Sequence, residues 1–453
     1  MRTTIRKPRR RAVPRLLTLI LLSQLSLIAG CGGLGGLLGG GLGGAGGGPL
    51  GFIFAVVQLI QNLPNPVDTE LQAAAQPTAD AGIITDQLLG RNIVATAIFG
   101  FEAEASAGTL GPDGRIYYTE RVTGRVRAFD PATLASDPNP VVDLAVNSSG
   151  QRGLKGVCFS PDGMTMFVTY TSSTTGNDST TEAEGDKSRV SSFPFANGAV
   201  TGMETVLISG PVRDALFPSD INTIGKCEVG PDGKLYFAHG DLNSRFLAQN
   251  PATDVLAGKI HRVNPDGTIP SDNPLGADNT TYCLGLRHPA DFTFDSDPQS
   301  SDMWILDNGN IISDELNAGA AGANFGWPVI QGLNNTDPEV ILTTVTVGLF
   351  YRNPRIDFGQ TPINPMGVVV LRNSPYGTDL EGDVLIGQND LIDLNGTLQG
   401  QVVRWSLDST PFILRTPLFQ TAVQSGPIAD MFTGSNGFVF IVTPQDLYRV
   451  DPA

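Results

Sequence analysis

Short segments in which apolar residues alternate with polar ones, or run without interruption, recur along the chain, each after a tight turn. The turn is Pro-Asp-Gly or a related glycine-containing sequence, in which proline presets the first turn angle and glycine accepts a positive φ. Each segment therefore predicts a β-hairpin. The segments are LGPDGRIYYTE (110–120), FSPDGMTMFVTY (159–170), VGPDGKLYFAHGD (229–241), a degenerate FDSDPQSSDMWILDNG (294–309) and TGSNGFVFIVTP (433–444).

The spacing of these hairpins indicates a repeating architecture. The first four begin about 49 to 70 residues apart, and no segment beyond residue 95 shows a long apolar period of 3.6 residues. Repeated antiparallel units of this kind are typical of a β-propeller, in which radial repetition protects the strand edges. About 360 residues at roughly 60 residues per blade give six blades. We therefore expect an all-β fold, a six-bladed β-propeller over residues 91–453.

The first 90 residues follow a different pattern. Residues 1–15 are basic, residues 16–29 are apolar, and Cys31 follows a Leu-Ile-Ala-Gly sequence. This order predicts a lipoprotein signal peptide over residues 1–30 and lipidation of Cys31. A short transmembrane anchor is the alternative, but about 14 apolar residues are fewer than the roughly 20 that a span needs. Residues 31–90 are expected to form a Gly/Leu-rich linker and a poorly defined lead-in.

Charge limits the partners that this chain can bind. Its 453 residues include 45 Asp and Glu against 29 Lys and Arg, and seven of the basic residues lie in the predicted signal peptide. The remainder carries 22 basic and 45 acidic residues, a net charge of −23. A surface this acidic repels nucleic acid and anionic lipid. We expect no nucleic-acid partner, and membrane contact through the lipid anchor only, in the periplasm or at the surface of a bacterial cell.

Three cysteines remain beyond the lipidation site, namely Cys158, Cys227 and Cys283. An exported compartment permits disulfides, but an odd number allows at most one bridge and leaves one thiol over. All three lie in apolar segments, so small buried side chains are the preferred interpretation and a single disulfide is the alternative.

Three further segments carry a specific resemblance. They are AGKIHRVNPDGTIPSDNPLG (257–276), LGLRHPADFTFD (284–295) and WILDNGNIISDELNAGAAGANFGWPVIQG (304–332). In order and spacing they resemble the soluble quinoprotein glucose/sorbosone dehydrogenase family, including its aldose sugar dehydrogenases. Weaker similarity in SGQRGLKGVCFSPDG (149–163) extends the match to roughly residues 95–445. The resemblance implies a central cavity holding pyrroloquinoline quinone (PQQ) and Ca²⁺, and oxidation of a sugar at its C1 hydroxyl with an unidentified electron acceptor.

The resemblance also assigns positions around the cofactor. Gln151 takes the place of a glutamine on the substrate side, and Arg287 that of an arginine near the reactive carbonyl and the sugar. His288 stands where the family has asparagine, next to this arginine. Gly309 and Asn310 fall where two backbone carbonyls bind calcium, and carbonyl ligands need no particular side chain.

The catalytic base of the family is absent from its expected position. Asp241 matches the aspartate that orients a catalytic histidine, but the histidine position holds Asn222, and an amide cannot accept the proton. One alternative base is His239, because residues two apart on a strand face the same side and His239 would then point with Asp241. The other interpretation, which we favour, is that His239 is a hydrogen-bonded core or rim residue.

The expected counter-charges for PQQ are also missing. The family supplies a lysine and two arginines from its last blades, whereas residues 386–396 and 423–432 contain no Lys or Arg here. The three PQQ carboxylates need paired cations once buried, so we expect weakened PQQ binding. Two functions remain open: a PQQ-dependent sugar dehydrogenase, and a non-catalytic propeller that binds a carbohydrate or a surface partner.

Overall fold

The computed structural model describes residues 93–213, 219–297, 302–333, 349–392, 398–406, 415–420 and 426–452. The predicted signal peptide (1–30), the lipidation site Cys31 and the linker (31–90) lie outside these residues. Within the described part of the chain, no helix has the length and hydropathy required to cross a membrane.

The described strands form six sheets, in which almost all neighbouring strands run antiparallel. The first sheet along the chain contains β2 (Ala105–Leu110), β3 (Ile116–Glu120), β4 (Arg125–Asp130), β5 (Ala135–Ser136) and β6 (Val142–Asp143). The second contains β7 (Leu154–Phe159), β8 (Thr165–Thr171), β9 (Lys187–Ala196), β10 (Ala199–Val200) and β11 (Thr205–Pro211). The third contains β12 (Ile224–Val229), β13 (Leu235–His239), β14 (Lys259–Val263), β15 (Thr281–Leu284), β19 (Ala323–Asn324) and β20 (Phe350–Tyr351). The fourth sheet contains β16 (Pro289–Phe294), β17 (Met303–Asp307), β18 (Glu315–Gly319) and β21 (Ile356–Asp357). The fifth contains β22 (Pro365–Val370), β23 (Val384–Ile392), β24 (Leu398–Trp405) and β25 (Arg415–Gln420). The sixth contains β26 (Asp430–Thr433), β27 (Val439–Val442), β28 (Asp446–Pro452) and β1 (Ile93–Gly100).

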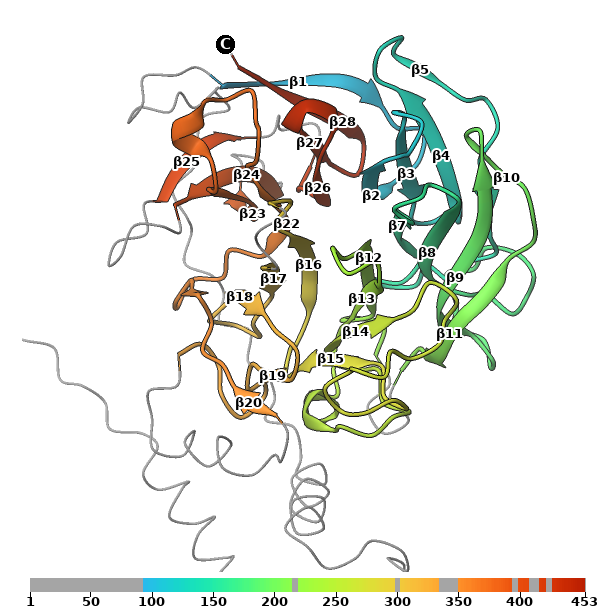
Figure 1. Cartoon of the computed structure of the whole chain (residues 1–453), viewed down its shortest axis with the longest axis vertical. Coiled ribbons are helices and arrows are strands. Elements are labelled where there is room, and N and C mark those ends of the chain that lie inside the picture. The colour runs from blue at the N-terminus through green and yellow to red at the C-terminus, as the bar shows by residue number, and fades with distance from the viewer. Residues whose placement is uncertain are drawn as a thin grey trace, which may run out of the picture. The chain divides into compact units, whose positions relative to one another are not determined.

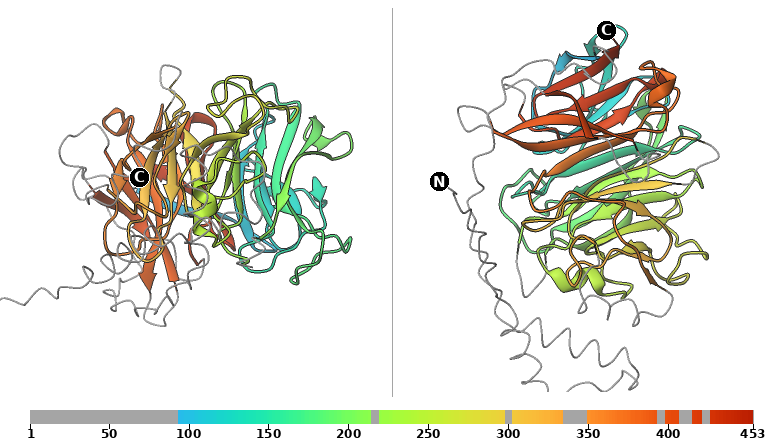
Figure 2. Two further views of the ribbon diagram at one scale, coloured as in Figure 1. Left: turned by 90° about the horizontal axis from the view of Figure 1, so that it is seen from below. Right: turned by 90° about the vertical axis from the view of Figure 1, so that its left-hand side faces the viewer.

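The sheets are arranged around a central axis as a β-propeller (Figure 1). The innermost strands β2, β7, β12, β16, β22 and β26 each pack against the next, and β26 packs against β2 to complete the cycle. Seen from below, their strands run roughly along the axis (Figure 2, left). The predicted all-β propeller is therefore confirmed.

Pairing between the two ends of the described chain closes the ring. β1 runs antiparallel to β28, with Ile93 opposite Pro452 and Gly100 opposite Asp446. The last sheet is thus built from both ends of the propeller, in the order β1-β28-β27-β26. This pairing ties the two ends of the propeller together in one sheet, with β1 as its outermost strand.

The predicted turns connect the first and second strands of the sheets. In the β2–β3, β7–β8 and β12–β13 turns the glycines Gly114, Gly163 and Gly233 have φ of 82°, 69° and 72°. The preceding aspartate of each turn accepts a hydrogen bond from the backbone N–H two residues on, at 2.9–3.2 Å. Asp-Gly supplies both the positive φ and the side-chain acceptor that such a turn needs.

The β22–β23 hairpin was not predicted from the sequence pattern, and its connection explains why. The connection spans Leu371–Asp383, contains the 3₁₀ turn η3 (Thr378–Leu380) and has no Pro-Asp-Gly sequence. Two other 3₁₀ turns, η1 (Arg245–Gln249) and η4 (Ser435–Gly437), lie in loops. No other helix occurs in the described residues, in agreement with the missing 3.6-residue period.

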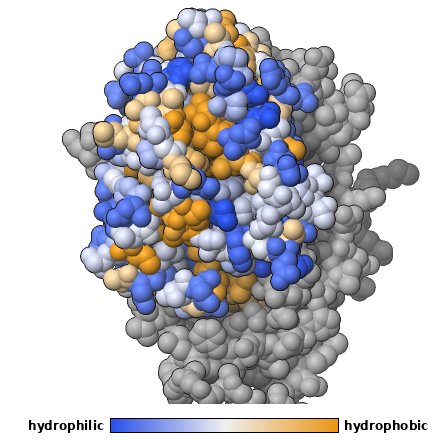
Figure 3. Space-filling view, turned by 90° about the vertical axis from the view of Figure 1, so that its right-hand side faces the viewer, coloured by the Kyte–Doolittle hydropathy of each residue, from blue (hydrophilic) through white to orange (hydrophobic). Residues whose placement is uncertain are grey.

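Apolar side chains fill the space between adjacent sheets. Between the β16–β18 sheet and the β22–β24 sheet, Trp304, Leu306 and Leu316 pack with Ile386 and Trp405, all at most 8% exposed. Successive residues of these strands point to opposite faces of the sheet, and each face packs against a neighbouring sheet. Because both faces are covered, the sequences of the strands contain runs of apolar residues. Figure 3 shows the outer side near β9–β11, where hydrophobic residues lie in small groups among hydrophilic ones.

Two of the three cysteines meet between the innermost strands of adjacent sheets. Cys158 on β7 and Cys227 on β12 are buried free thiols with their Sγ atoms 2.8 Å apart. Gly156 permits this close approach, because a Cβ there would lie 2.9 Å from the Cys227 nitrogen. Cys283 is also buried and free, on β15. The preferred interpretation of small buried side chains therefore agrees with the structure.

We predict that oxidation joins Cys158 to Cys227. Treating the full chain with diamide should remove one hydrogen from each thiol, so that of Cys158, Cys227 and Cys283 only Cys283 remains available for alkylation in denaturant, as read from peptide masses. The bridge would close a loop between residues 69 apart in sequence, which stabilises the fold by about 4 kcal/mol in the chain-entropy treatment. The Cys158→Ser variant is the control, and three alkylated thiols after oxidation of the wild type would contradict the prediction.

Candidate active site

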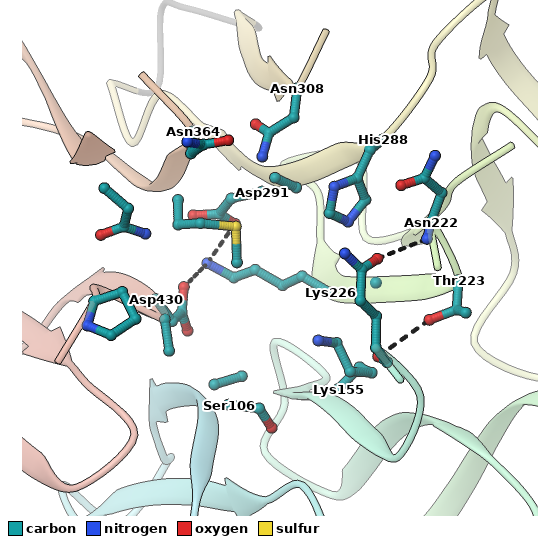
Figure 4. Close-up of a pocket in the computed structure, with 18 of the residues that line it drawn as sticks. Ser106, Lys155, Asn222, Thr223, Lys226, His288, Asp291, Asn308, Asn364 and Asp430 are labelled. Atoms are coloured by element: carbon teal, nitrogen blue, oxygen red, sulfur yellow. Dashed lines mark hydrogen bonds and ion pairs between the residues drawn. The ribbon is translucent and has the colours of Figure 1, made fainter. Parts of the chain in front are cut away.

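A cavity of about 620 Å³ lies at the centre of the propeller. All six sheets contribute to its wall through their innermost strands (Figure 4). The contributions include Ser106 of β2, Lys155 of β7, Lys226 of β12, Asp291 of β16, Met366 of β22 and Asp430 of β26. A space bounded by six separate segments is the default location for a ligand site in such a fold.

Three charged side chains of the cavity wall form one ion-paired group. The Lys226 Nζ lies 3.0 Å from Asp291 Oδ1 and 3.0 Å from Asp430 Oδ1 (Figure 4). Burial raises the pKa of Asp291 to about 7, although the Lys226 charge opposes this shift, and the two carboxylates raise the pKa of Lys226. Each carboxylate also holds a neighbouring inner strand, because Asp291 accepts from Val368 N and Asp430 from Gly108 N, both at 2.8 Å.

Lys155 presents a free ammonium to the cavity. No hydrogen bond or ion pair to its Nζ occurs within the described residues, and its side chain points into the cavity in Figure 4. Burial, and then the charge of Arg121, lower the pKa of Lys155 to about 8. Arg121 itself is paired with Glu104 and with three backbone carbonyls. Lys155 is therefore the unneutralised cation that an anionic ligand would meet first.

Asn222, Asp241 and Gln151 form one hydrogen-bonded group. Asn222 Nδ2 donates to Asp241 Oδ1 at 2.8 Å, and Asn222 N donates to Gln151 Oε1 at 2.6 Å. Asn222 has a φ of 51°, a conformation that asparagine tolerates better than most residues. Gly240 allows the approach, since a Cβ there would lie 2.3 Å from the Asn222 carbonyl oxygen. Asn222 and Gln151 line the cavity, and Asp241 lies behind them.

Two further hydrogen bonds hold the Asp241 carboxylate in place. Trp327 Nε1 donates to Asp241 Oδ2 at 2.9 Å, and Asn243 N donates to Oδ1 at 2.8 Å. Burial raises the pKa of Asp241, while these donors and the Arg287 charge oppose the shift. Trp327 is 4% exposed and contacts the Arg287 guanidinium on its face, so it acts as a packing anchor. The group thus fixes the orientation of Asn222, and its one carboxylate is fully used by donors from Asn222, Asn243 and Trp327.

His288 and Arg287 lie side by side in the cavity wall. Asp307 accepts hydrogen bonds from both backbone N–H groups, at 2.7–3.1 Å, which fixes the direction of this turn. The imidazole of His288 points into the cavity on the side of Asn222 (Figure 4). Burial, together with the charges of Arg287 and Lys155, lowers the pKa of His288 to about 3.

His239 is not part of the cavity. It ends β13, the second strand of its sheet, and lies opposite Ile224 of the innermost strand. Its ring is fully buried, with Nδ1 2.8 Å from Gly240 O and Nε2 3.3 Å from Ser188 Oγ. The alternative of His239 as a channel base is therefore not supported, because β12 separates its side chain from the axis and Ser188 of the next sheet engages it.

The predicted calcium ligands do not present a calcium site as they are arranged. Gly309 and Asn310 do line the cavity. However, Arg287 Nη1 donates to Gly309 O at 2.7 Å and to Asn308 O at 3.2 Å, so a guanidinium already uses the carbonyl that the ion needs. Within the described residues, no group of three His, Cys, Asp or Glu side chains is placed to hold a metal ion. Calcium at Gly309 would first require Arg287 to move.

PQQ, in contrast, fits the cavity better than the sequence predicted. Lys155 has no partner, Arg287 forms no ion pair in the described part of the chain, and both face the cavity. The buried Asn308 Oδ1 also lacks a hydrogen-bond donor. These groups match an anionic, polar ligand, because charge-assisted hydrogen bonds are the strong ones.

Four charged residues of the site were missed by the sequence argument: Lys155, Lys226, Asp291 and Asp430. A signal was present, since each lies in the apolar strand that precedes a predicted turn, in LKGVCFSPDG, IGKCEVGPDG, ADFTFDSDP and ADMFTGSNG. A charged residue within an otherwise apolar innermost strand is the feature that marks the axis.

Comparison with known proteins agrees with this geometry. The family model for glucose / sorbosone dehydrogenase matches residues 106–449. Quinoprotein glucose dehydrogenase B of Acinetobacter calcoaceticus is 29% identical over 244 residues, which cover 49% of this chain and 49% of that protein. Aldose sugar dehydrogenase YliI of Escherichia coli (strain K12) is 34% identical over 115 residues, 24% of this chain and 30% of that protein. The chain thus matches about half or less of the length of these two curated relatives.

A solved structure shows the same fold. The PQQ-bound aldose sugar dehydrogenase from Streptomyces coelicolor superimposes with a TM-score of 0.59 at 18% identity, over 80% of this chain and 98% of that chain. At this level of identity the likeness concerns the fold alone.

We predict that Lys226→Met strongly destabilises the fold in a pH-dependent way. Removing the ammonium leaves two buried carboxylates without a counter-charge, which costs about 3–5 kcal/mol. The pKa of Asp291 is about 7 in the folded protein, against an ordinary value of 3.8. At a pH between these two values the folded protein therefore keeps a proton on Asp291 that the unfolded chain has lost. The stability from this group is therefore complete below the ordinary Asp pKa of 3.8 and is lost as the pH rises through about 7.

In the variant, protonation of one carboxyl relieves the repulsion, so the loss should be smaller at pH 5 than at pH 8. Urea unfolding at both pH values measures it, with the exposed Lys187→Met as the matched control. An equal loss at the two pH values would contradict this account.

Proposed function

The chain belongs to the glucose/sorbosone dehydrogenase family, and from this premise we propose that it is a PQQ-dependent dehydrogenase that oxidises the C1 hydroxyl of an aldose-type sugar. The observation that carries the proposal is the central cavity, in which the unneutralised Lys155 and Arg287 face the Asn222–Asp241–Gln151 group. The alternative of a non-catalytic carbohydrate-binding propeller is not favoured, since the matching curated relatives include a quinoprotein glucose dehydrogenase and an aldose sugar dehydrogenase.

Lys155 and Arg287 would hold the carboxylates of PQQ by charge-assisted hydrogen bonds. When bound, PQQ supplies a quinone that accepts a hydride from the sugar. The Lys226–Asp291–Asp430 group stays unavailable to such an anion, because its one ammonium is already shared between two carboxylates. Lys155 and Arg287, which have no carboxylate partner in the described residues, would therefore decide on which side of the cavity the acidic edge of the cofactor lies.

Asn222 and Gln151 would orient the sugar. Since Asn222 Nδ2 is committed to Asp241, the Asn222 Oδ1 atom is left to accept a hydrogen bond from a sugar hydroxyl. The Gln151 Oε1 atom is committed to Asn222 N, so its Nε2 is left to donate. Both amides position a hydroxyl group, but neither can accept its proton. The proton acceptor must be another group of the wall.

The proposal extends to the organisation of the whole protein. Each of the six sheets is taken as one blade of a six-bladed propeller. The basic and apolar pattern of residues 1–30 and the following Cys31 support a lipid anchor on the extracytoplasmic side of a bacterial membrane. Electrons would leave to an acceptor outside the chain. Calcium at Gly309 and Asn310 is not part of the proposed chemistry, because Arg287 uses the Gly309 carbonyl.

The first test is a PQQ titration of the full chain in detergent, followed through the cofactor absorbance. We expect saturable binding of one PQQ per chain without added calcium, and then reduction of an artificial acceptor when aldoses are supplied. Absence of binding at high micromolar PQQ would overturn the proposed function. Saturable binding without turnover of any aldose tested would reject the sugar substrate.

We predict that Lys155→Met weakens PQQ binding. A hydrogen bond to a charged group contributes about 1.5–3 kcal/mol, so the PQQ dissociation constant should rise by roughly 10- to 100-fold. The same titration measures this, with Lys187→Met as the control for loss of a lysine charge elsewhere. An unchanged dissociation constant would show that Lys155 does not contact the cofactor.

A further inference from the structure

We propose that His288 is the proton acceptor of the sugar oxidation, in place of the histidine that is missing at position 222. This assignment rests on the proposed function. Three observations support it: His288 lines the cavity, its ring nitrogens contact no protein group in the described residues, and the acidic groups of the wall are already paired.

The chain contains three histidines, and two of them are unavailable. His239 and His261 are fully buried, and both ring nitrogens of each have a partner. Those of His261 lie 2.8 Å from Thr280 Oγ1 and 2.8 Å from Leu256 O. His288 alone lines the cavity, and its ring nitrogens contact no protein group in the described residues. It is the one imidazole with a lone pair free for a ligand.

The position of His288 suits this role. Its ring lies on the side of the cavity where Asn222 and Gln151 would orient a hydroxyl (Figure 4). The backbone N–H group of His288 donates to Asp307 Oδ1 at 2.7 Å and its carbonyl accepts from Asn308 N at 3.0 Å, so the residue is held on both sides. A general base needs such a fixed position within reach of the proton that it removes.

The other polar groups of the wall are poor candidates. Asp291 and Asp430 are bound to Lys226, and Glu104 is bound to Arg121. Removing a proton with any of these carboxylates would break an existing ion pair. Lys155 is charged below its pKa of about 8 and is the group that an anionic cofactor needs as a counter-charge.

The charges around His288 support its action once the cofactor is bound. Arg287 and Lys155 both lower the pKa of His288, in addition to burial, and keep its ring neutral. Burial is the largest cause of the lowered pKa and would remain, but a tricarboxylate beside these two cations would cancel part of their field and so raise the pKa of the ring. The base would then be strongest in the complex in which it is used.

The C1–H bond breaks and the hydrogen leaves with its electron pair to the quinone, while the C1 hydroxyl proton moves to a ring nitrogen of His288. The C1–O bond becomes a carbonyl, so the sugar loses two hydrogens and two electrons. His288 becomes an imidazolium ion and releases its proton to water through the open side of the cavity.

The first experiment labels the full chain, without cofactor, with diethyl pyrocarbonate at neutral pH. Peptide masses should show modification of His288 and none of His239 or His261, with all three modified after unfolding. Bound PQQ should protect His288. An unmodified His288 in the folded protein would overturn the assignment, whatever the activity.

The second experiment compares His288→Ala with the wild type at saturating PQQ. We expect kcat to fall by about 10²- to 10⁴-fold, with the absorbance titration still showing saturable PQQ binding. Added imidazole should restore part of kcat, since the shortened side chain leaves room for it. His261→Gln, checked for folding by thermal melting, is the control and should keep kcat.

The outcomes separate the two proposals. Wild-type kcat in His288→Ala, or a loss of kcat that imidazole does not restore, would overturn the role of His288 while the dehydrogenase function stands. Failure of the wild type to bind PQQ would overturn the proposed function, and this assignment with it.

Discussion

Closure of the ring is the constraint on which the site depends. β1 and β28 pair although they lie at opposite ends of the propeller, from Ile93 opposite Pro452 to Gly100 opposite Asp446. In the closed ring β26 packs between β22 and β2. The closed cycle brings the innermost strands together, and with them Lys226 and Asp430, which are 204 residues apart in sequence.

The charges at the axis show how such a centre is made stable. Asp291 and Asp430 would repel each other in a buried space, and Lys226 lies 3.0 Å from both. Their other oxygens accept backbone N–H groups of the neighbouring sheets. The same residues therefore balance charge on one side of the cavity and join adjacent sheets. Lys155 and Arg287 have no carboxylate partner in the described residues, so their positive charges lie on the other side.

The arrangement also separates two tasks that one histidine would otherwise combine. Asp241 holds Asn222 as it would hold a histidine, through a 2.8 Å hydrogen bond, so the orienting function of this position survives. Accepting a proton is a different property, since it needs a lone pair with a suitable pKa. In our proposal His288 supplies the lone pair from the wall of the same cavity, and its pKa, lowered to about 3 without the cofactor, would rise when an anion binds beside it.

The fold was largely predictable from the chain. The Pro-Asp-Gly turns and apolar segments are local signals, because turn chemistry and strand alternation depend on neighbouring residues only. They predicted an all-β propeller correctly. They missed the β22–β23 hairpin, whose connection at Leu371–Asp383 has no such turn. The family resemblance predicted which residues gather at the centre, including Gln151, Asn222, Arg287 and His288.

Contacts across the ring could not be predicted in this way. The sequence alone determined the fold class, the family and the absence of a histidine at position 222. Only the tertiary structure decided that Lys155 and Lys226 supply cations, that Arg287 uses the Gly309 carbonyl, and that His288 rather than His239 faces the cavity. The physical reason is that hydrogen bonding, burial and charge at the axis depend on strands from six different parts of the chain, whose relative position no local pattern contains.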